Sequence, residues 1–161
     1  MKTIFLLRHA QALLYSSNNS DINRSINDDG KREAEFVGEL LLKKNEFPQL
    51  IISSPALRAF TTAIIVAQKI NYPEKEILIN KNIYEASSKK LKVIIHKTDP
   101  KIESLMLVGH NPGISDFIYE ISEIDFDFLP TAGLVCLKND IQSWDDIEGK
   151  WILKYNYNPR N

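Results

Sequence analysis

The chain has 161 residues, of which 43% are hydrophobic and 25% charged, and its formal net charge is -1. This composition is typical of a globular protein, and the length predicts a single domain over residues 1–161. A net charge this small gives no overall field that would attract nucleic acid or an anionic membrane. The lone Cys136 excludes an internal disulfide, and no apolar run is long enough for a secretory signal or a membrane span, so we expect a cytoplasmic protein.

Strand and helix patterns alternate from the start of the chain. Residues 3–7 are apolar throughout, which predicts a strand buried on both faces. A polar segment over residues 16–29 follows, and its composition is that of a loop, either a flexible surface loop or a rim over a nearby site. Asp28 or Asp29 can then cap a helix whose apolar face includes Leu42.

The same alternation continues to the end of the chain. Residues 50–52 predict a second strand, after which Ser54 can cap a helix with Pro55 at its first position. Further helices are expected after Ser87 or Ser88, either of which can cap one, and near Pro112. The remaining predicted strands cover residues 77–79, 104–108, 133–137 and 151–155. This order predicts a three-layer α/β/α sandwich with a mainly parallel sheet, and it leaves open whether the tail adds an antiparallel edge strand.

Arginine and histidine residues follow three of the predicted strands. The first strand leads into Arg8 and His9, the second into a helix start that carries Arg58, and the fourth into His110. The carboxyl ends of parallel strands face one crevice, so we expect these four side chains to meet. With no carboxylate beside them they would repel one another, and a bound dianion would remove that conflict. Phosphate is therefore the expected occupant.

A histidine within such a cluster can act as a nucleophile toward phosphorus. Phosphoryl transfer depends mostly on positioning and on charge that stabilises the equatorial oxygens, and the arginines supply that charge. The helices expected near Ser54 and Asn111 would add backbone N–H groups. We expect no metal and no other cofactor, because the histidines show no paired ligand spacing and His96 is predicted to lie on the surface.

Several segments resemble the motifs of the histidine phosphatase (phosphoglycerate mutase-like) superfamily. Residues 5–10 (FLLRHA) are similar to its first signature and residues 53–59 (SSPALRA) to its second. Residues 108–113 (VGHNPG) resemble its third motif in the form typical of the SixA-type phosphohistidine phosphatases. Residues 21–34 and the tail over 144–159 resemble the same branch, so the similarity spans nearly the whole chain.

This resemblance implies a phosphoglycerate mutase-like fold and assigns roles to the four clustered side chains. His9 would be the nucleophile that becomes phosphorylated, while Arg8, Arg58 and His110 would bind the phosphoryl group. The implied function is a metal-independent phosphatase that acts on phosphohistidine in a signalling protein. A phosphatase of a small metabolite phosphate and a non-catalytic phosphate-binding module are the alternatives, and an intact His9 argues against the second.

Three further residues are candidates on weaker grounds. Relatives often place an acidic residue after the third strand, so Glu85 is a candidate general acid, with an ordinary exposed glutamate as the alternative. A phosphohistidine substrate needs such an acid less, because imidazole leaves easily once it is protonated. Arg24 and Asn111 are candidate substrate contacts.

Overall fold

A six-stranded sheet forms the centre of the computed structural model, which describes residues 1–160. Its strands are β1 (Lys2–Arg8), β2 (Leu50–Ser53), β3 (Leu78–Ile79), β4 (Ser104–Gly109), β5 (Leu134–Asn139) and β6 (Ile152–Tyr157). They lie in the order β3-β2-β4-β1-β5-β6, and the four strands from β3 to β1 in that order are parallel. β5 pairs antiparallel with both neighbours. The predicted mainly parallel sheet is confirmed, and the tail adds an antiparallel pair.

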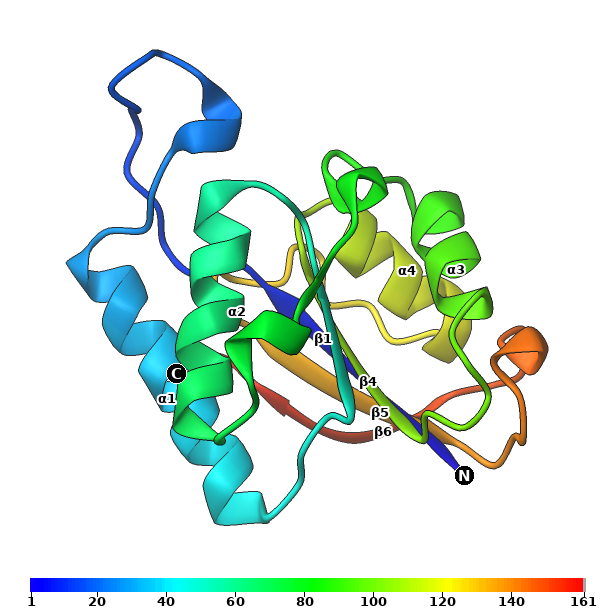
Figure 1. The fold of residues 1–161 in the computed structure, drawn as a ribbon. Helices are drawn as coiled ribbons and strands as arrows, with labels where there is room; N and C mark the ends of the chain where they lie inside the picture. The colour runs from blue at the N-terminus through cyan, green and yellow to red at the C-terminus, as the bar shows by residue number, and fades with distance from the viewer. Residues whose placement is uncertain (161) are drawn as a thin grey trace.

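Helices cover both faces of this sheet, as Figure 1 shows. They are α1 (Asp28–Lys44), α2 (Leu57–Lys69), α3 (Ser88–His96) and α4 (Gly113–Ser122), with short 3-10 turns η1 (Asp21–Asn23), η2 (Glu74–Glu76), η3 (Lys81–Ile83) and η4 (Trp144–Asp146). One hydrophobic cluster joins α1 and α2 to the sheet, and a second joins α3 and α4 to its other face. This confirms the three-layer α/β/α architecture. None of the helices over residues 1–160 is long and apolar enough to cross a bilayer.

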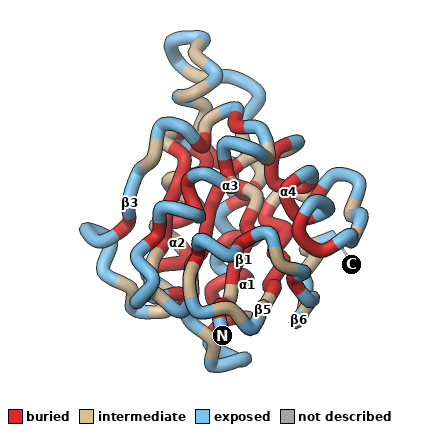
Figure 2. The backbone as a smooth tube through the Cα atoms, turned by 90° about the vertical axis from the view of Figure 1, so that its right-hand side faces the viewer, coloured by how far each residue is buried: buried red, intermediate tan, exposed pale blue. Residues whose placement is uncertain are grey.

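The buried strands show why both faces need a helical cover. In β1, Ile4 and Leu6 belong to the cluster under α3 and α4, whereas Phe5 and Leu7 belong to the cluster under α1 and α2. Successive side chains of a strand point to opposite faces, so a continuous apolar run can be buried only between two layers. Figure 2 shows this buried centre with exposed segments around it.

The start of α1 differs by one residue from the prediction. Asn27 is the N-cap, and its side chain accepts the backbone N–H of Gly30 at 2.7 Å. Asp28 and Asp29 lie in the first turn, where their charge interacts favourably with the helix dipole. The prediction that Leu42 shares the buried face is wrong, because its position in the helix turns it toward solvent and leaves it 45% exposed.

The start of α2 is two residues later than predicted. The helix begins at Leu57, and Ala56 before it has an extended backbone. Ser54 therefore does not cap the helix with Pro55 at its first position. Its Oγ accepts the N–H of Ala56 at 3.2 Å and also contacts His110, so this hydroxyl serves the site as well as the turn.

α3 and α4 begin where the sequence predicts. Ser87 is the N-cap of α3 and accepts the N–H of Lys90 at 3.3 Å, and Pro112 directly precedes α4. Gly113 at the start of α4 lies against the chain before α3. A Cβ there would lie 2.1 Å from the carbonyl oxygen of Ala86, so only glycine permits this close approach.

Candidate active site

The ends of β1, β2 and β4 bring the four predicted side chains to one edge of the sheet. Arg8 is in register with Gly109, and the N–H of His9 donates to the Gly109 carbonyl at 3.0 Å. The rings of His9 and His110 lie with their centroids 5.3 Å apart. Arg58 lies in the first turn of α2, which follows β2. The convergence predicted from parallel strands is therefore present in the structure.

The backbone of the next residue holds the neutral His9 ring in one tautomer. Its Nδ1 lies 2.8 Å from the carbonyl oxygen of Ala10, and a carbonyl only accepts, so Nδ1 carries the proton. The lone pair of the neutral ring is then on Nε2. Burial is the main cause that lowers the pKa of His9 to about 3; His110, Arg58 and Arg8 contribute to this lowering, and the Ala10 carbonyl opposes it. At neutral pH this arrangement gives a nucleophilic nitrogen.

His110 is fixed by Ser54 on the neighbouring strand end. Its Nε2 lies 2.7 Å from Ser54 Oγ, which already accepts the N–H of Ala56. The Ser54 hydroxyl thus contacts both the backbone of Ala56 and the ring of His110, which holds that ring in place. Burial, followed by the charge of Arg58, lowers the pKa of His110 to about 4.

Arg58 has a carboxylate partner, contrary to the expectation that the cluster would have none. It is 6% exposed, and its guanidinium donates to the backbone oxygen of Asp21 at 2.8 Å and to the Asp21 carboxylate at 3.1 Å. The Tyr84 hydroxyl also donates to this carboxylate. This bond, with the guanidinium groups of Arg24 and Arg58, holds the pKa of Asp21 well below its usual range. Asp21 is therefore an anion at neutral pH.

Arg8 and Asn111 share one backbone acceptor. Arg8 Nη1 and Asn111 Nδ2 donate to the carbonyl oxygen of Leu129, at 2.9 and 2.8 Å. The Asn111 side-chain oxygen accepts the hydroxyl of Ser115 at 2.7 Å, and Ser115 Oγ in turn accepts the N–H of Leu129 at 2.9 Å. Both polar atoms of the Asn111 amide therefore hold the loop around Leu129 against α4. The Leu129 carbonyl in that loop in turn orients Arg8.

Thr62 connects the histidine strand to the arginine helix. Its Oγ1 accepts the N–H of Ala10 at 2.9 Å and donates to the carbonyl of Arg58 at 2.7 Å. Thr62 is fully buried. Thr62 thereby holds Ala10 in place from its N–H side, and the carbonyl of Ala10 orients the histidine ring.

The polar segment before α1 forms a rim over the site, which decides between the two interpretations of that loop. Residues 13–25 project beyond the sheet in Figure 1, and η1 within them supplies Asp21. Arg24 donates to Asp21 at 2.9 Å and to the Leu13 carbonyl at 2.7 Å, so it braces the rim. Glu85 directly follows Tyr84, whose hydroxyl donates to Asp21 of the rim. It is exposed, has a φ of 54°, and its carboxylate makes no hydrogen bond within residues 1–160.

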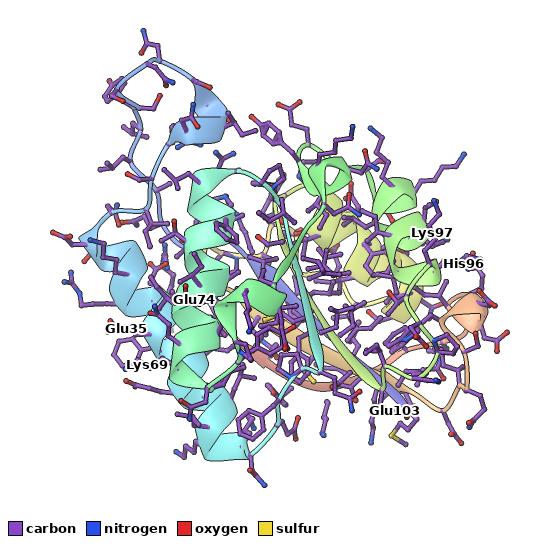
Figure 3. The ribbon with its side chains drawn as sticks, in the orientation of Figure 1. Glu35, Lys69, Glu74, His96, Lys97 and Glu103 are labelled. Carbon is purple, nitrogen blue, oxygen red and sulfur yellow. The ribbon has the colours of Figure 1, made fainter. Side chains whose placement is uncertain are left out.

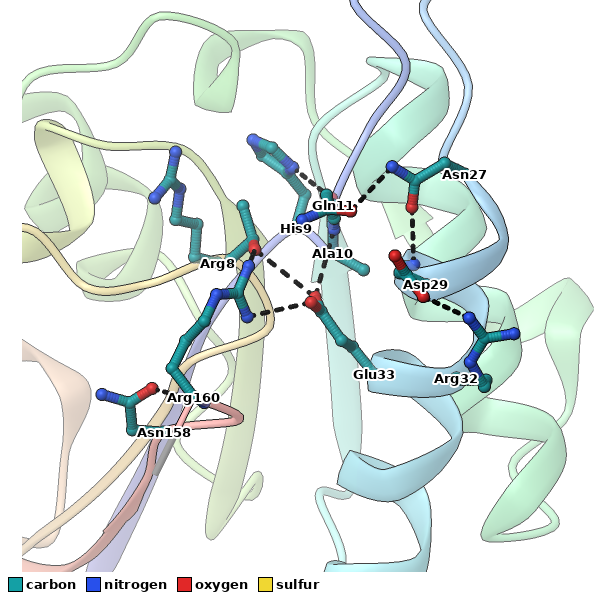
Figure 4. Close-up of polar contacts among 12 residues, drawn as sticks. Arg8, His9, Ala10, Gln11, Asn27, Asp29, Arg32, Glu33, Asn158 and Arg160 are labelled. Atoms are coloured by element: carbon teal, nitrogen blue, oxygen red, sulfur yellow. Dashed lines mark hydrogen bonds and ion pairs between the residues drawn. The ribbon is translucent and has the colours of Figure 1, made fainter.

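A second polar network supports the turn after β1 from the side of α1. Figure 4 shows Arg8 and His9 at the end of β1, with Glu33 beside them. Glu33 accepts the backbone N–H of Gln11 at 3.3 Å and pairs with Arg160 at 2.9 Å. The end of the chain is thereby attached to the segment that follows His9.

The third histidine lies away from the cluster, as predicted. Figure 3 shows His96 on the last turn of α3, where its side chain is 52% exposed and its Nε2 lies 3.3 Å from Asp145. Within residues 1–160, no group of three or more His, Cys, Asp and Glu side chains is placed to hold a metal ion.

Three buried nitrogens of the cluster lack a hydrogen-bond partner within residues 1–160. They are Arg8 Nε, Arg58 Nε and His110 Nδ1. A buried polar group without a partner costs free energy, so such groups are rare unless a ligand satisfies them. All three can donate protons, and they belong to cationic or titratable side chains, which is the surrounding an oxyanion requires.

A family model of the histidine phosphatase superfamily (branch 1) matches residues 4–101, more than half of the chain. The chain belongs to the histidine phosphatase superfamily. The match includes Arg8, His9 and Arg58 and ends before His110, so the geometry described above is what joins His110 to the other three. An uncharacterized chloroplastic protein of Arabidopsis thaliana is 27% identical over 95% of this chain and 76% of its own length.

Solved structures show the same fold over almost the whole chain. A protein from Agrobacterium tumefaciens assigned as the phosphohistidine phosphatase SixA is 28% identical, with a TM-score of 0.82 and 98% of each chain covered. A SixA complex with tungstate has a TM-score of 0.84 at 18% identity over 99% and 98% of the chains. A mycobacterial glucosyl-3-phosphoglycerate phosphatase has a TM-score of 0.72 at 14% identity over 96% and 97%. The last two likenesses show the fold.

Sequence reasoning placed the four central side chains but assigned no role to their partners. Asp21 and Thr62 lie in segments that resemble the family, yet neither stood out as a site residue. Leu129 contributes a backbone oxygen, which has no signature in the sequence. Tyr84, whose hydroxyl donates to Asp21, was likewise not predicted as a site residue.

We predict that Thr62→Val lowers turnover more than it weakens substrate binding. Valine has nearly the same shape, but it leaves the buried N–H of Ala10 without an acceptor, which costs about 1–3 kcal/mol of stability. The Ala10 carbonyl then orients His9 less firmly, so kcat should fall about tenfold while KM changes little. Thr61→Val is the matched control, since Thr61 is the partly exposed neighbour on the same helix. Equal effects of the two variants on kcat would contradict the role of Thr62.

We also predict that binding of tungstate takes up protons. The free site holds His9 and His110 neutral, with pKa values of about 3 and about 4, and a bound dianion raises both. The complex therefore binds more protons than the free protein, so affinity should rise as the pH falls from about 8 to about 5. Calorimetric titrations in buffers of different ionisation enthalpy measure this uptake. Binding heats that do not depend on the buffer would contradict it.

Proposed function

We propose that this protein is a metal-independent phosphatase that removes phosphate from phosphohistidine in a protein, through an intermediate in which His9 carries the phosphoryl group. The observation that carries the proposal is the protonation pattern of His9. Its Nδ1 donates to Ala10, so Nε2 presents a lone pair beside Arg8, Arg58 and His110. A nucleophile inside a set of phosphate-binding donors is what transfer to nitrogen requires.

The reaction proceeds in two displacements at phosphorus. The substrate ring is first protonated by solvent on its free nitrogen; His9 Nε2 then attacks phosphorus, the bond between phosphorus and the substrate nitrogen breaks, and the ring departs as neutral imidazole. Arg8, Arg58 and His110 hold the phosphoryl oxygens on which charge accumulates. Water then attacks phosphorylated His9, which releases inorganic phosphate and restores the neutral ring. Asp21 and the Leu129 carbonyl keep the two guanidinium groups in place.

The acids around the site support a substrate with a nitrogen leaving group. Asp21 is the carboxylate that contacts the cluster, and its lowered pKa leaves it without a proton to donate. Glu85 is exposed and makes no hydrogen bond to the four central side chains. An alkoxide leaving group depends on a proton from a positioned acid, whereas a protonated imidazole leaves without one.

Similar proteins support binding of an oxyanion at this position. SixA was solved with tungstate, and the mycobacterial glucosyl-3-phosphoglycerate phosphatase with vanadate. Both ions resemble phosphate. The second enzyme also shows that this fold serves a small sugar phosphate, so the substrate class must be tested directly.

The first test compares wild type with His9→Ala on a protein domain phosphorylated on histidine and on p-nitrophenyl phosphate. Wild type should release phosphate from the protein with a kcat/KM at least tenfold above that for the small ester. The variant should lose both activities by about three orders of magnitude or more, because the nucleophile is absent. A phosphoenzyme that is stable to base and labile to acid should accumulate in wild type alone.

Each other result selects an alternative. Turnover of small esters without turnover of the protein would leave the pocket intact and make this a metabolite phosphatase. Binding of phosphate without turnover of either substrate would make it a binding module. Full activity in His9→Ala would refute the mechanism itself.

We further predict that Glu85→Gln separates the two kinds of substrate. We propose Glu85 as the acid for slow turnover of oxygen leaving groups, since it is an exposed carboxylate next to Tyr84. Because no hydrogen bond within residues 1–160 holds it in position, it serves esters poorly, whereas phosphohistidine needs no such acid. The variant should lower turnover of an alkyl phosphate such as glycerol phosphate by tenfold or more and leave phosphohistidine turnover within about twofold. Glu76→Gln, on an exposed 3-10 turn before β3, is the control. Equal loss on both substrates would show that Glu85 has another role.

A further inference from the structure

A large groove lies on the sheet face beside α3, outside the phosphate site. It has a volume of about 860 Å³ and runs from the start of β2 to the segment between β3 and α3. Its apolar floor and walls are formed by Leu50, Ile52, Leu78, Val93 and Ile94. We call it the α3 groove.

The α3 groove exists because the helical layer on this face is incomplete. α3 and α4 pack against each other, and α4 lies over β1, near the middle of the sheet. β2 and β3 form the edge of the sheet, and Figure 2 shows β3 at the exposed side of the molecule. On this edge Leu78 is 52% exposed, and Val93 on α3 facing it is 45% exposed. The groove thus has the position and apolar lining at which one more helix of the layer would pack.

The rim of the α3 groove is positively charged. Lys89, Lys90 and Lys97 line it, and none of them forms an ion pair with any of residues 1–160. Figure 3 shows Lys97 at the outer end of α3. Asp99 is the acidic side chain of the lining. Other surface lysines, such as Lys92 and Lys150, do have carboxylate partners. Within residues 1–160 the groove rim thus carries three lysines without an ion pair beside one carboxylate, so its net charge is positive.

One end of the α3 groove is also part of the wall of the phosphate site. The segment over residues 80–87 contributes Asn80, Asn82 and Ser87 to the groove. From the same segment Tyr84 points the other way, with its ring 5.6 Å from that of His110 and its hydroxyl on Asp21. A molecule seated in the groove would therefore lie next to the mouth of the pocket that holds His9.

We propose that the α3 groove docks an amphipathic helix with acidic residues along its flanks, supplied by the phosphorylated protein substrate. This inference rests on the proposed function. The apolar floor matches the apolar stripe of such a helix, and the three lysines match acidic side chains beside that stripe. α3 itself, with nine residues, is roughly 13 Å long, so the groove beside it accommodates about two and a half helical turns. Docking there would present a phosphohistidine on the same protein to His9.

The test is a charge reversal in the groove that leaves the phosphate site untouched. Val93→Glu/Lys97→Glu places acidic groups against an acidic partner, at positions that are exposed in the free protein. Leu42→Glu/Lys43→Glu on α1 is the matched control, because Leu42 is 45% exposed like Val93 and the charge change is the same. The substrates are an all-helical phosphotransfer domain with an acidic surface, phosphorylated on histidine, and p-nitrophenyl phosphate.

The groove variant should lose at least tenfold in kcat/KM on the protein, mainly through KM, and keep its activity on the small ester within twofold. The control should keep both. Full activity of the groove variant on the protein would overturn the docking proposal, and so would equal losses on the two substrates. If wild type itself does not turn over the protein, the proposed function fails instead.

A second measurement locates the contact. Hydrogen exchange of His9→Ala with the phosphorylated domain bound should show protection at Ser88–His96 and Leu78–Ile79. Protection confined to residues 13–25 would place the partner on the rim and overturn the groove.

Discussion

Keeping two guanidinium groups and two imidazoles together in a buried position is the constraint on which this site depends. Burial lowers the pKa of His9 and His110, so both rings are neutral and add no repulsion. The positive charge that remains is offset by Asp21 at Arg58 and by the Leu129 carbonyl at Arg8. The cluster can therefore stay assembled before any anion arrives, with its unpaired donors already directed by the surrounding backbone.

The sequence was enough to place the four central side chains, because parallel inner strands bring the residues that follow them to the same edge of the sheet. β1 and β4 are apolar on both faces, which marks them as inner strands, and parallel inner strands end at the same edge. Arg8, His9 and His110 are the first polar residues after those strands. At these positions the apolar pattern of each strand is therefore enough to predict where the next residues lie in the fold. The family resemblance added the order of the motifs.

The supporting residues could not be found in this way, because their roles arise from packing between distant segments. Asp21 reaches Arg58 across 37 residues of sequence, from a loop whose composition indicated only flexibility or a rim. The late start of α2 has a similar cause: Ser54 uses its hydroxyl on His110, a contact that no helix-capping rule contains. Leu42 was misplaced because apolar residues that are adjacent in a helix cannot all face one side.

Substrate choice in such a site has to come from groups that do not touch the phosphoryl oxygens. Arg8, Arg58 and His110 would bind the phosphoryl group of an ester and of a phosphoramidate in the same way. What differs is the leaving group, which meets an ionised Asp21 and the loosely held Glu85. The body of the substrate also differs, and it meets the lysine-lined apolar edge beside α3. A dianion pocket shared by a whole fold family becomes selective when its rim disfavours oxygen leaving groups and its flank attracts one kind of partner.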